Sequence, residues 1–202
     1  RGENDQRYFL WTLTKEDYKH TLFPVGQMDK VEVRKLAKKF NLPTAEKKDS
    51  QGICFLGDVD IEEFLSHFVK TKAGKVLNEE GDVMGRHNGT LYYTLGERHG
   101  FEIDRKSPHS KPLFVIAKDM KKNTITVSEI KKEMRDVKLE RVNWLEKPIG
   151  KELSAQVRYR QKKFSVEVEG HKVKFLTPQT ATPGQSIVFY KGEKLIGGGI
   201  IA

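Results

Sequence analysis

Residues 165–196 read SVEVEGHKVKFLTPQTATPGQSIVFYKGEKLI, and most of what the sequence predicts about architecture starts from them. Short runs rich in Val, Ile and Phe are separated by pairs typical of turns, namely Glu169-Gly170, Pro183-Gly184 and Lys191-Gly192. Short strands at such regular spacing favour a small barrel, and we predict a six-stranded β-barrel over residues 131–202. Its predicted strands are Val137–Val142, Ala155–Tyr159, Ser165–Val168, Lys172–Leu176, Ile187–Tyr190 and Lys194–Ile196.

The N-terminal part of the sequence carries helix signals instead. Asp29 followed by Glu32 predicts a capping box, and apolar residues recur after it at helical spacing as far as Phe40. Asp60 opens a similar pattern, and Thr14 is suited to cap a shorter helix. We expect both longer apolar stripes to face a hydrophobic core.

Residues 74–127 have the texture of short strands joined by polar turns. The charged stretch Glu129–Asp136 indicates the approach to a domain boundary. We therefore expect an α+β chain with a helical segment at 1–59, a small β-rich domain at 60–130 and the barrel at 131–202. The strands predicted in the middle domain are Lys75–Leu77, Asp82–Met84, Leu91–Leu95, Leu113–Ala117 and Thr124–Val127.

Composition narrows the class of protein. The 202 residues carry a net charge of +9, and residues 151–202 alone contain 9 basic and 4 acidic side chains. A basic region indicates a polyanionic partner such as RNA, or simply a basic solvated surface. No apolar run approaches the ~20 residues that a membrane span needs, so we expect no membrane partner. The single cysteine excludes an internal disulfide and suits the cytoplasm. Because the sequence starts with Arg1 rather than Met, we expect a piece of a longer protein.

The cysteine lies in a segment that suggests chemistry. Residues 47–57 read KKDSQGICFLG, and the two glycines that bracket Cys54 allow the backbone to approach a ligand closely. The lysines favour the reactive thiolate, whereas Asp49 opposes it. The alternative is a buried cysteine that packs between Ile53 and Phe55 as a small hydrophobe. A Cys–His hydrolase stays open without a particular His, and no metal site is predicted because the usual ligand spacing is missing.

The run from Lys48 to Phe55, KDSQGICF, resembles the cysteine motif of the tRNA-specific 2-thiouridylases. Further motifs similar to that family occur in the family's order and cover nearly the whole chain. They are Asp5-Gln6, Tyr8-Phe9-Leu10, His20-Thr21-Leu22-Phe23-Pro24, Tyr92-Tyr93-Thr94-Leu95-Gly96, Val157-Arg158-Tyr159-Arg160-Gln161, Pro183-Gly184-Gln185-Ser186, Phe189-Tyr190 and Gly197-Gly198-Gly199-Ile200.

The resemblance implies an enzyme that replaces the C2 oxygen of the wobble uridine of certain tRNAs with sulfur. Members of the family use ATP to adenylate that oxygen, and they pass sulfur from a cysteine persulfide, which the motif places on Cys54. The family's ATP-binding loop and second catalytic cysteine lie upstream, so we expect this chain alone to lack an ATP site and thiolation activity. The expected partners are tRNA and a cysteine desulfurase or sulfur relay protein. The implied fold is the helical tail of an α/β nucleotide-binding domain, then a β-rich domain and a barrel similar to those of translation factors.

The resemblance also implies a set of tRNA contacts. The amide of Gln6 suits the reading of a base edge, while two arginines and a tyrosine offer phosphate contacts and a stacking ring. Side chains alternate between the two faces of a β-strand, so in the predicted strand Arg158 and Arg160 lie on one face and Tyr159 lies on the opposite face. The implied residues are Asn4, Asp5, Gln6, Arg158, Tyr159, Arg160 and Gln185.

Two departures from the family pattern accompany the resemblance. Asn4 occupies a position that is usually lysine, and residues 101–112 are charged where the family has a glycine-rich loop near its active site. We expect this loop to bear on sulfur delivery or on the choice of tRNA. The alternative function is a non-catalytic RNA-binding module in which Cys54 is a structural residue.

Overall fold

The computed structural model describes four stretches of the chain, residues 6–47, 61–104, 111–148 and 153–202. The chain divides into two compact units. We call the first the barrel unit, which comprises Arg1–Asp49 and Met134–Ala202, and the second the sheet unit, which comprises Ser50–Glu133. None of the helices in the described stretches is both long and apolar enough to cross a membrane.

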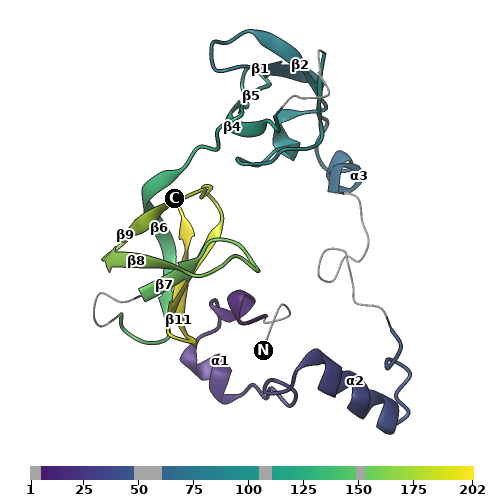
Figure 1. Ribbon diagram of the computed structural model, residues 1–202, viewed down its shortest axis with the longest axis vertical. Helices are drawn as coiled ribbons and strands as arrows, with labels where there is room; N and C mark the ends of the chain where they lie inside the picture. The colour runs from purple at the N-terminus through teal and green to yellow at the C-terminus, as the bar shows by residue number, and fades with distance from the viewer. Residues whose placement is uncertain (1–5, 48–60, 105–110, 149–152) are drawn as a thin grey trace. The chain divides into compact units, whose positions relative to one another are not determined.

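Six antiparallel strands of the barrel unit close into a barrel in the order β10-β11-β6-β9-β8-β7 (Figure 1). Side chains that point inward fill it, and Val166, Val173, Ile187 and Phe189 are completely buried there. The predicted six-stranded barrel is therefore confirmed. The strands are β6 (Met134–Trp144), β7 (Leu153–Gln156), β8 (Phe164–Glu169), β9 (Lys172–Gln179), β10 (Ser186–Lys191) and β11 (Lys194–Ile201).

Local turn chemistry explains how these strands are joined. Gly170 connects β8 to β9 and Gly192 connects β10 to β11, and both have a φ of 58°. A residue with a Cβ is strained in this left-handed region, whereas glycine is not, so the predicted turns form where expected. The prediction of a strand over Ala155–Tyr159 is only partly right, because β7 ends at Gln156.

The N-terminal part of the barrel unit contains a 3-10 turn, η1 (Gln6–Leu10), and the helices α1 (Lys15–Lys19) and α2 (Lys30–Lys39). The capping box predicted for α2 is present: Asp29 Oδ1 accepts from Glu32 N at 2.8 Å, and Glu32 Oε2 accepts from Asp29 N at 2.9 Å. Thr14 caps α1 as predicted.

The apolar stripe of α2 does not face a core. Val33 and Leu36 are half-buried, Phe40 at the end of the helix is 65% exposed, and no residue of α2 is buried. The prediction of a core-facing stripe is therefore wrong for the stretches that the structure describes. The hydrophobic residues are correctly spaced, but no described element covers them.

The sheet unit holds a five-stranded sheet in the order β3-β2-β1-β5-β4, in which only the β1–β5 pair is parallel. Val76, Val115, Ile125 and Val127 form its buried centre. The predicted hairpin between β1 and β2 is present. The elements are α3 (Ile61–Ser66), β1 (Gly74–Leu77), β2 (Val83–His87), η2 (Thr90–Tyr92), β3 (Phe101–Ile103), β4 (Phe114–Asp119) and β5 (Thr124–Ser128).

Three predictions for the sheet unit need correction. Leu91–Leu95 is not a strand, because Thr90 N and Oγ1 both donate to Asn123 Oδ1, at 3.2 and 2.8 Å, and the chain there makes the 3-10 turn η2. Residues 101–103, taken as part of a loop, form the edge strand β3. Phe68 belongs to the apolar stripe after Asp60 that was expected to face a core, but it is 71% exposed. The predicted cap Asp60 lies outside the described residues.

Candidate nucleic-acid interface

The residues predicted to act on RNA or sulfur divide into two groups. Three lie outside the described residues: Asn4, Asp5 and Cys54. The other five all belong to the barrel unit: Gln6, Arg158, Tyr159, Arg160 and Gln185.

The N-terminal segment formed by residues 6–13 packs against the outer surface of the barrel. Trp11 is only 6% exposed and contacts the outward-facing side of β10. Asn143 of β6 fixes the backbone, because its Nδ2 donates to the carbonyl oxygens of Trp11 and Leu13, at 2.7 and 2.9 Å. The strand β10 therefore has its inner face in the barrel core and its outer face covered by Trp11. The docking determines where Gln6 leaves the barrel surface.

Tyr8 anchors the front of this segment next to the predicted residues. Its hydroxyl donates to the carbonyl oxygen of Ser186, at 2.9 Å, one residue after Gln185. Burial raises the pKa of Tyr8 to about 12, and the nearby positive charge of Arg158 acts in the opposite direction. The phenol is therefore a permanent donor at neutral pH. Arg7 reinforces the contact through an ion pair with Glu193, at 3.3 Å.

Arg158, Tyr159 and Arg160 lie in a turn that follows β7, so the prediction of an alternating strand is wrong here. The side chain of Gln161 imposes the turn, because its Oε1 accepts from the backbone N–H groups of Val157 and Arg158, at 3.0 and 3.2 Å. These donors would otherwise extend the ladder with β10. Arg160 has a φ of 64°, an uncommon conformation for a residue with a Cβ. Both arginines are exposed, and Tyr159 is half-buried.

The turn and the N-terminal segment meet in a cluster of aromatic rings. The ring centroids of Phe9 and Tyr159 are 4.9 Å apart, and the edge of Tyr8 meets Phe9 at 5.3 Å. The guanidinium carbon of Arg160 lies 5.2 Å from the centroid of the Tyr159 ring, a cation–π contact. Two chain segments far apart in sequence therefore place aromatic rings and an arginine together.

Gln185 adds a polar group beside this cluster. Its backbone is fully used: the N–H donates to Thr182 O at 3.1 Å, and the carbonyl oxygen accepts from Ile201 N at 2.9 Å. Its side-chain Oε1 is buried and has no hydrogen-bond partner among the described residues. A buried acceptor without a donor is unusual in a folded protein.

The segment after Gln6, the 158–160 turn and Ser186, the neighbour of Gln185, are thus brought together on the barrel unit. Exposed arginines, aromatic rings and free amide groups are the groups that proteins use to bind phosphates and unpaired bases. Sequence reasoning missed Phe9 and the two residues that position it, Trp11 and Asn143. Their contacts join segments more than 100 residues apart, and no local pattern reveals such contacts.

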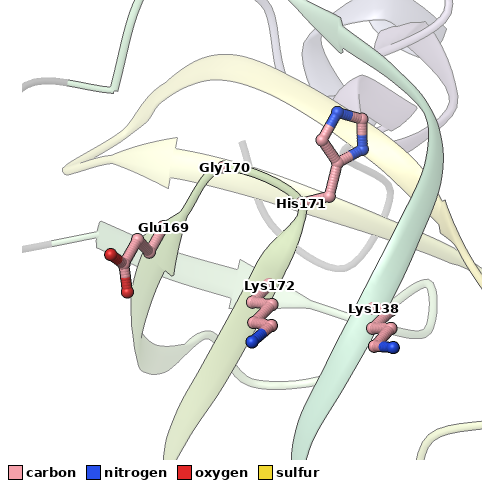
Figure 2. A pocket seen from close by; sticks show the side chains of 5 residues that line it. All are labelled: Lys138, Glu169, Gly170, His171 and Lys172. Carbon is pink, nitrogen blue, oxygen red and sulfur yellow. The ribbon is translucent and has the colours of Figure 1, made fainter.

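An open pocket lies elsewhere on the barrel, at the turn between β8 and β9, with a volume of about 460 Å³. In Figure 2 the amino groups of Lys138 and Lys172 extend side by side from neighbouring strands, and the His171 ring points away from them. Glu169 lies opposite Lys172 in the register of β8 and β9. None of the sequence-predicted site residues lines this pocket. In the described stretches, no cluster of three or more His, Cys, Asp or Glu side chains is arranged to hold a metal ion.

Three domain families match consecutive parts of the chain. The tRNA methyl transferase HUP domain matches residues 2–58, and the tRNA methyl transferase PRC-barrel domain matches residues 62–129. The aminomethyltransferase beta-barrel domain matches residues 134–201, which contain all six strands of the barrel.

Curated relatives match the chain from end to end. The tRNA-specific 2-thiouridylase MnmA of Lacticaseibacillus paracasei is 39% identical over 213 residues, which are 99% of this chain and 56% of the relative. The protein of the same name from Shewanella amazonensis is 38% identical over 214 residues, covering 99% of this chain and 57% of the relative. The protein of the same name from Streptococcus thermophilus is 40% identical over 213 residues, covering 99% of this chain and 57% of the relative. The chain therefore spans little more than half the length of these relatives.

Proposed function

Since the chain belongs to the family of tRNA-specific 2-thiouridylases, we propose that it supplies the tRNA-docking surface and the sulfur-carrying cysteine of an enzyme that thiolates C2 of the wobble uridine. One observation carries the proposal: the segment that follows Gln6 packs on the barrel beside two other assigned positions, because Phe9 contacts Tyr159 and the Tyr8 hydroxyl binds Ser186, the neighbour of Gln185. The curated relatives match 99% of the chain, whereas each of the three domain families matches only one part of it. The proposal therefore follows the activity in the relatives' name.

In this proposal Cys54 carries the sulfur as a persulfide. Its terminal sulfur attacks C2 of the uridine after adenylation has turned the C2 oxygen into a leaving group. A second cysteine thiolate then attacks Cys54, so that the sulfur–sulfur bond breaks, a disulfide forms and the transferred sulfur stays on the base. The two cysteines are oxidised as that sulfur is reduced, and thiols must reduce the disulfide before the next cycle.

ATP is a substrate of this reaction, and we propose that it binds to a part of the full enzyme outside this chain. The sequence has no glycine- and serine-rich loop of the kind that the family uses for ATP. The second cysteine must likewise come from outside, because Cys54 is the only one here. The proposed domain bounds are 1–59, 60–130 and 131–202, and the proposed protein partner is a cysteine desulfurase or sulfur relay protein. A cytoplasmic location stays a prediction.

The surface residues have separate roles in the proposal. Arg158 and Arg160 hold phosphates of the tRNA, and Gln185 contributes a polar contact from the neighbouring turn. Gln6, with Asn4 and Asp5 before it, approaches the target uridine. Phosphate contacts position the RNA without reading its sequence, so the arginines contribute affinity and the N-terminal amides contribute specificity.

The test measures tRNA binding and thiolation separately. In this chain, Arg158→Ala with Arg160→Ala should weaken binding of all tRNAs tested and lower the salt dependence, by roughly 0.7–0.9 of log–log slope for each lost phosphate contact. The matched control is Lys138→Ala with Lys172→Ala, which removes the same charge from the pocket at the β8–β9 turn. Equal effects of the two double variants would mean that the barrel binds RNA only through its net charge.

Thiolation needs the full-length enzyme. There, Cys54→Ser should abolish formation of 2-thiouridine, measured by mass spectrometry of digested tRNA, and leave tRNA affinity nearly unchanged. The present chain with tRNA, ATP and a sulfur donor should give no product. Retained thiolation in the Cys54→Ser enzyme would refute the catalytic role of Cys54 and favour a non-catalytic RNA-binding module.

A further inference from the structure

Phe9 is an exposed aromatic residue in a segment that otherwise packs tightly on the barrel. Trp11, two residues later, is 6% exposed, whereas Phe9 is 52% exposed. A single exposed phenylalanine is common on protein surfaces and has no meaning by itself. Here, however, the exposed ring does not stand alone, since it packs against Tyr159 with a centroid separation of 4.9 Å and an interplanar angle of 48°.

The pair is held from both sides. On the Phe9 side, the Tyr8 hydroxyl donates to Ser186 O, and the Asn143 amide binds the backbone at Trp11. On the Tyr159 side, Gln161 fixes the turn and donates from Nε2 to Gln179 Oε1, at 3.0 Å. The two chain segments that carry the rings are therefore held in place before any ligand arrives, which reduces the entropy that binding must overcome.

The charge around the pair is positive. Arg160 lies over Tyr159 at 5.2 Å, and Arg158 is close enough to Tyr8 for its charge to oppose the rise in the phenol pKa that burial causes. The carboxylate of Glu193, which lies at the end of the same segment's contacts with the barrel, binds Arg7 and Lys163, at 3.3 and 3.1 Å. An aromatic surface flanked by arginines suits a ligand that combines a flat ring with a phosphate, which is the chemistry of an unpaired nucleotide.

We propose that Phe9 and Tyr159 form a stacking platform for one unpaired base of the bound RNA, with Arg158 and Arg160 on the phosphates that flank it. That the RNA is a tRNA rests on the proposed function, whereas the platform itself requires only a single-stranded nucleotide. Phe9 is then a binding residue in its own right. Stacking tolerates any base, so the platform strengthens binding and orients the loop without choosing its sequence.

The experiment compares two ligands, a tRNA and a short single-stranded oligouridylate, by fluorescence anisotropy with the 202-residue chain. Phe9→Leu keeps an apolar side chain but removes the π face, and it should weaken binding of both ligands by roughly 5- to 150-fold. Phe9→Tyr keeps the ring and should bind within about two-fold of the unchanged chain. The salt dependence should stay the same in Phe9→Leu, because stacking releases no counterions.

Phe40→Leu is the matched control, since Phe40 is also exposed in the barrel unit but lies outside the cluster. It should bind both ligands like the unchanged chain. Circular dichroism checks that Phe9→Leu is folded, as expected for a residue that is half exposed. A fluorescent 2-aminopurine placed in the oligonucleotide should be quenched on binding, and this quenching should disappear in Phe9→Leu.

The outcomes separate the two proposals. If Phe9→Leu binds both ligands normally while the arginine variant loses tRNA, the platform is refuted and the proposed function stands. If oligouridylate binding depends on Phe9 but tRNA binds no better than double-stranded DNA, the platform stands and the proposed function fails. If neither RNA binds, both proposals are overturned.

Discussion

Residues 6–13 and helix α2 belong to the same N-terminal part of the chain but have very different surroundings. Trp11 of the first segment is 6% exposed, whereas Leu22, Val31 and Phe40, around and within α2, are 88%, 62% and 65% exposed. Both segments carry several large apolar residues, consecutive in the first and at helical spacing in the second. Trp11 is covered by β10, while no described element covers α2. The comparison teaches that an apolar pattern indicates the presence of a partner surface but does not identify it.

The largest expected effect comes from removing the residue that docks residues 6–13. Trp11→Ala should lower the free energy of unfolding of the barrel unit by about 3–5 kcal/mol, because a buried aromatic side chain is lost and a cavity remains on β10. Urea unfolding followed by circular dichroism measures it. A loss below about 1 kcal/mol would mean that the segment rests on the barrel without stabilising it.

A glycine of β11 tests the same contact from the opposite side. A Cβ at Gly198 would lie 2.7 Å from the Trp11 ring and 2.8 Å from Ile187 O. Gly198→Ala should therefore cost about 1–3 kcal/mol of unfolding free energy through overpacking. In a Trp11→Ala background this cost should shrink, because the ring is gone. Strict additivity of the two changes would contradict the close approach of Trp11 to Gly198.

Asn143 tests the polar part of the docking. Asn143→Ala removes the amide that donates to the carbonyl oxygens of Trp11 and Leu13, and it should cost about 1–2 kcal/mol. Hydrogen exchange of the 6–13 amides, measured by mass spectrometry, should become faster while the amides of β8 and β9 keep their protection. Uniformly faster exchange would indicate a general loss of barrel stability instead.

The smallest effect is expected at α2. Phe40→Ala should change the unfolding free energy of this chain by no more than about 0.5 kcal/mol, because the ring is mostly exposed. The same urea titration measures it beside Trp11→Ala. A loss of more than about 1 kcal/mol would show that Phe40 has a partner within the chain, and the contrast between the two segments would then disappear.

Features set by neighbouring residues were predicted well from the sequence. The barrel strands follow from alternating apolar residues and from glycines at turns such as Gly170 and Gly192, where only local backbone geometry matters. The cap of α2 follows from Asp29 and Glu32, three residues apart.

Features set by distant side chains were not predicted. The turn η2 replaces a strand because Thr90 binds Asn123, 33 residues away. The turn at Arg158 is a local feature that was also missed, because the Gln161 side chain accepts from the backbone N–H groups three and four residues before it. The Phe9–Tyr159 contact has no local signature. The predicted residues Gln6, Arg158, Tyr159, Arg160 and Gln185 came from family resemblance, and their role in binding tRNA stays a prediction.

The Tyr8–Ser186 hydrogen bond has a consequence for how the protein is made. The two residues are 178 positions apart, and ribosomes add about 5–20 residues per second, so roughly 10–35 s pass between their synthesis. Throughout that interval Trp11 has no β10 to cover it, and the nascent chain carries an unprotected aromatic segment. Docking of residues 6–13 must therefore be among the last events of folding, and a ribosome that stalls before β10 leaves residues 6–13 exposed to chaperones.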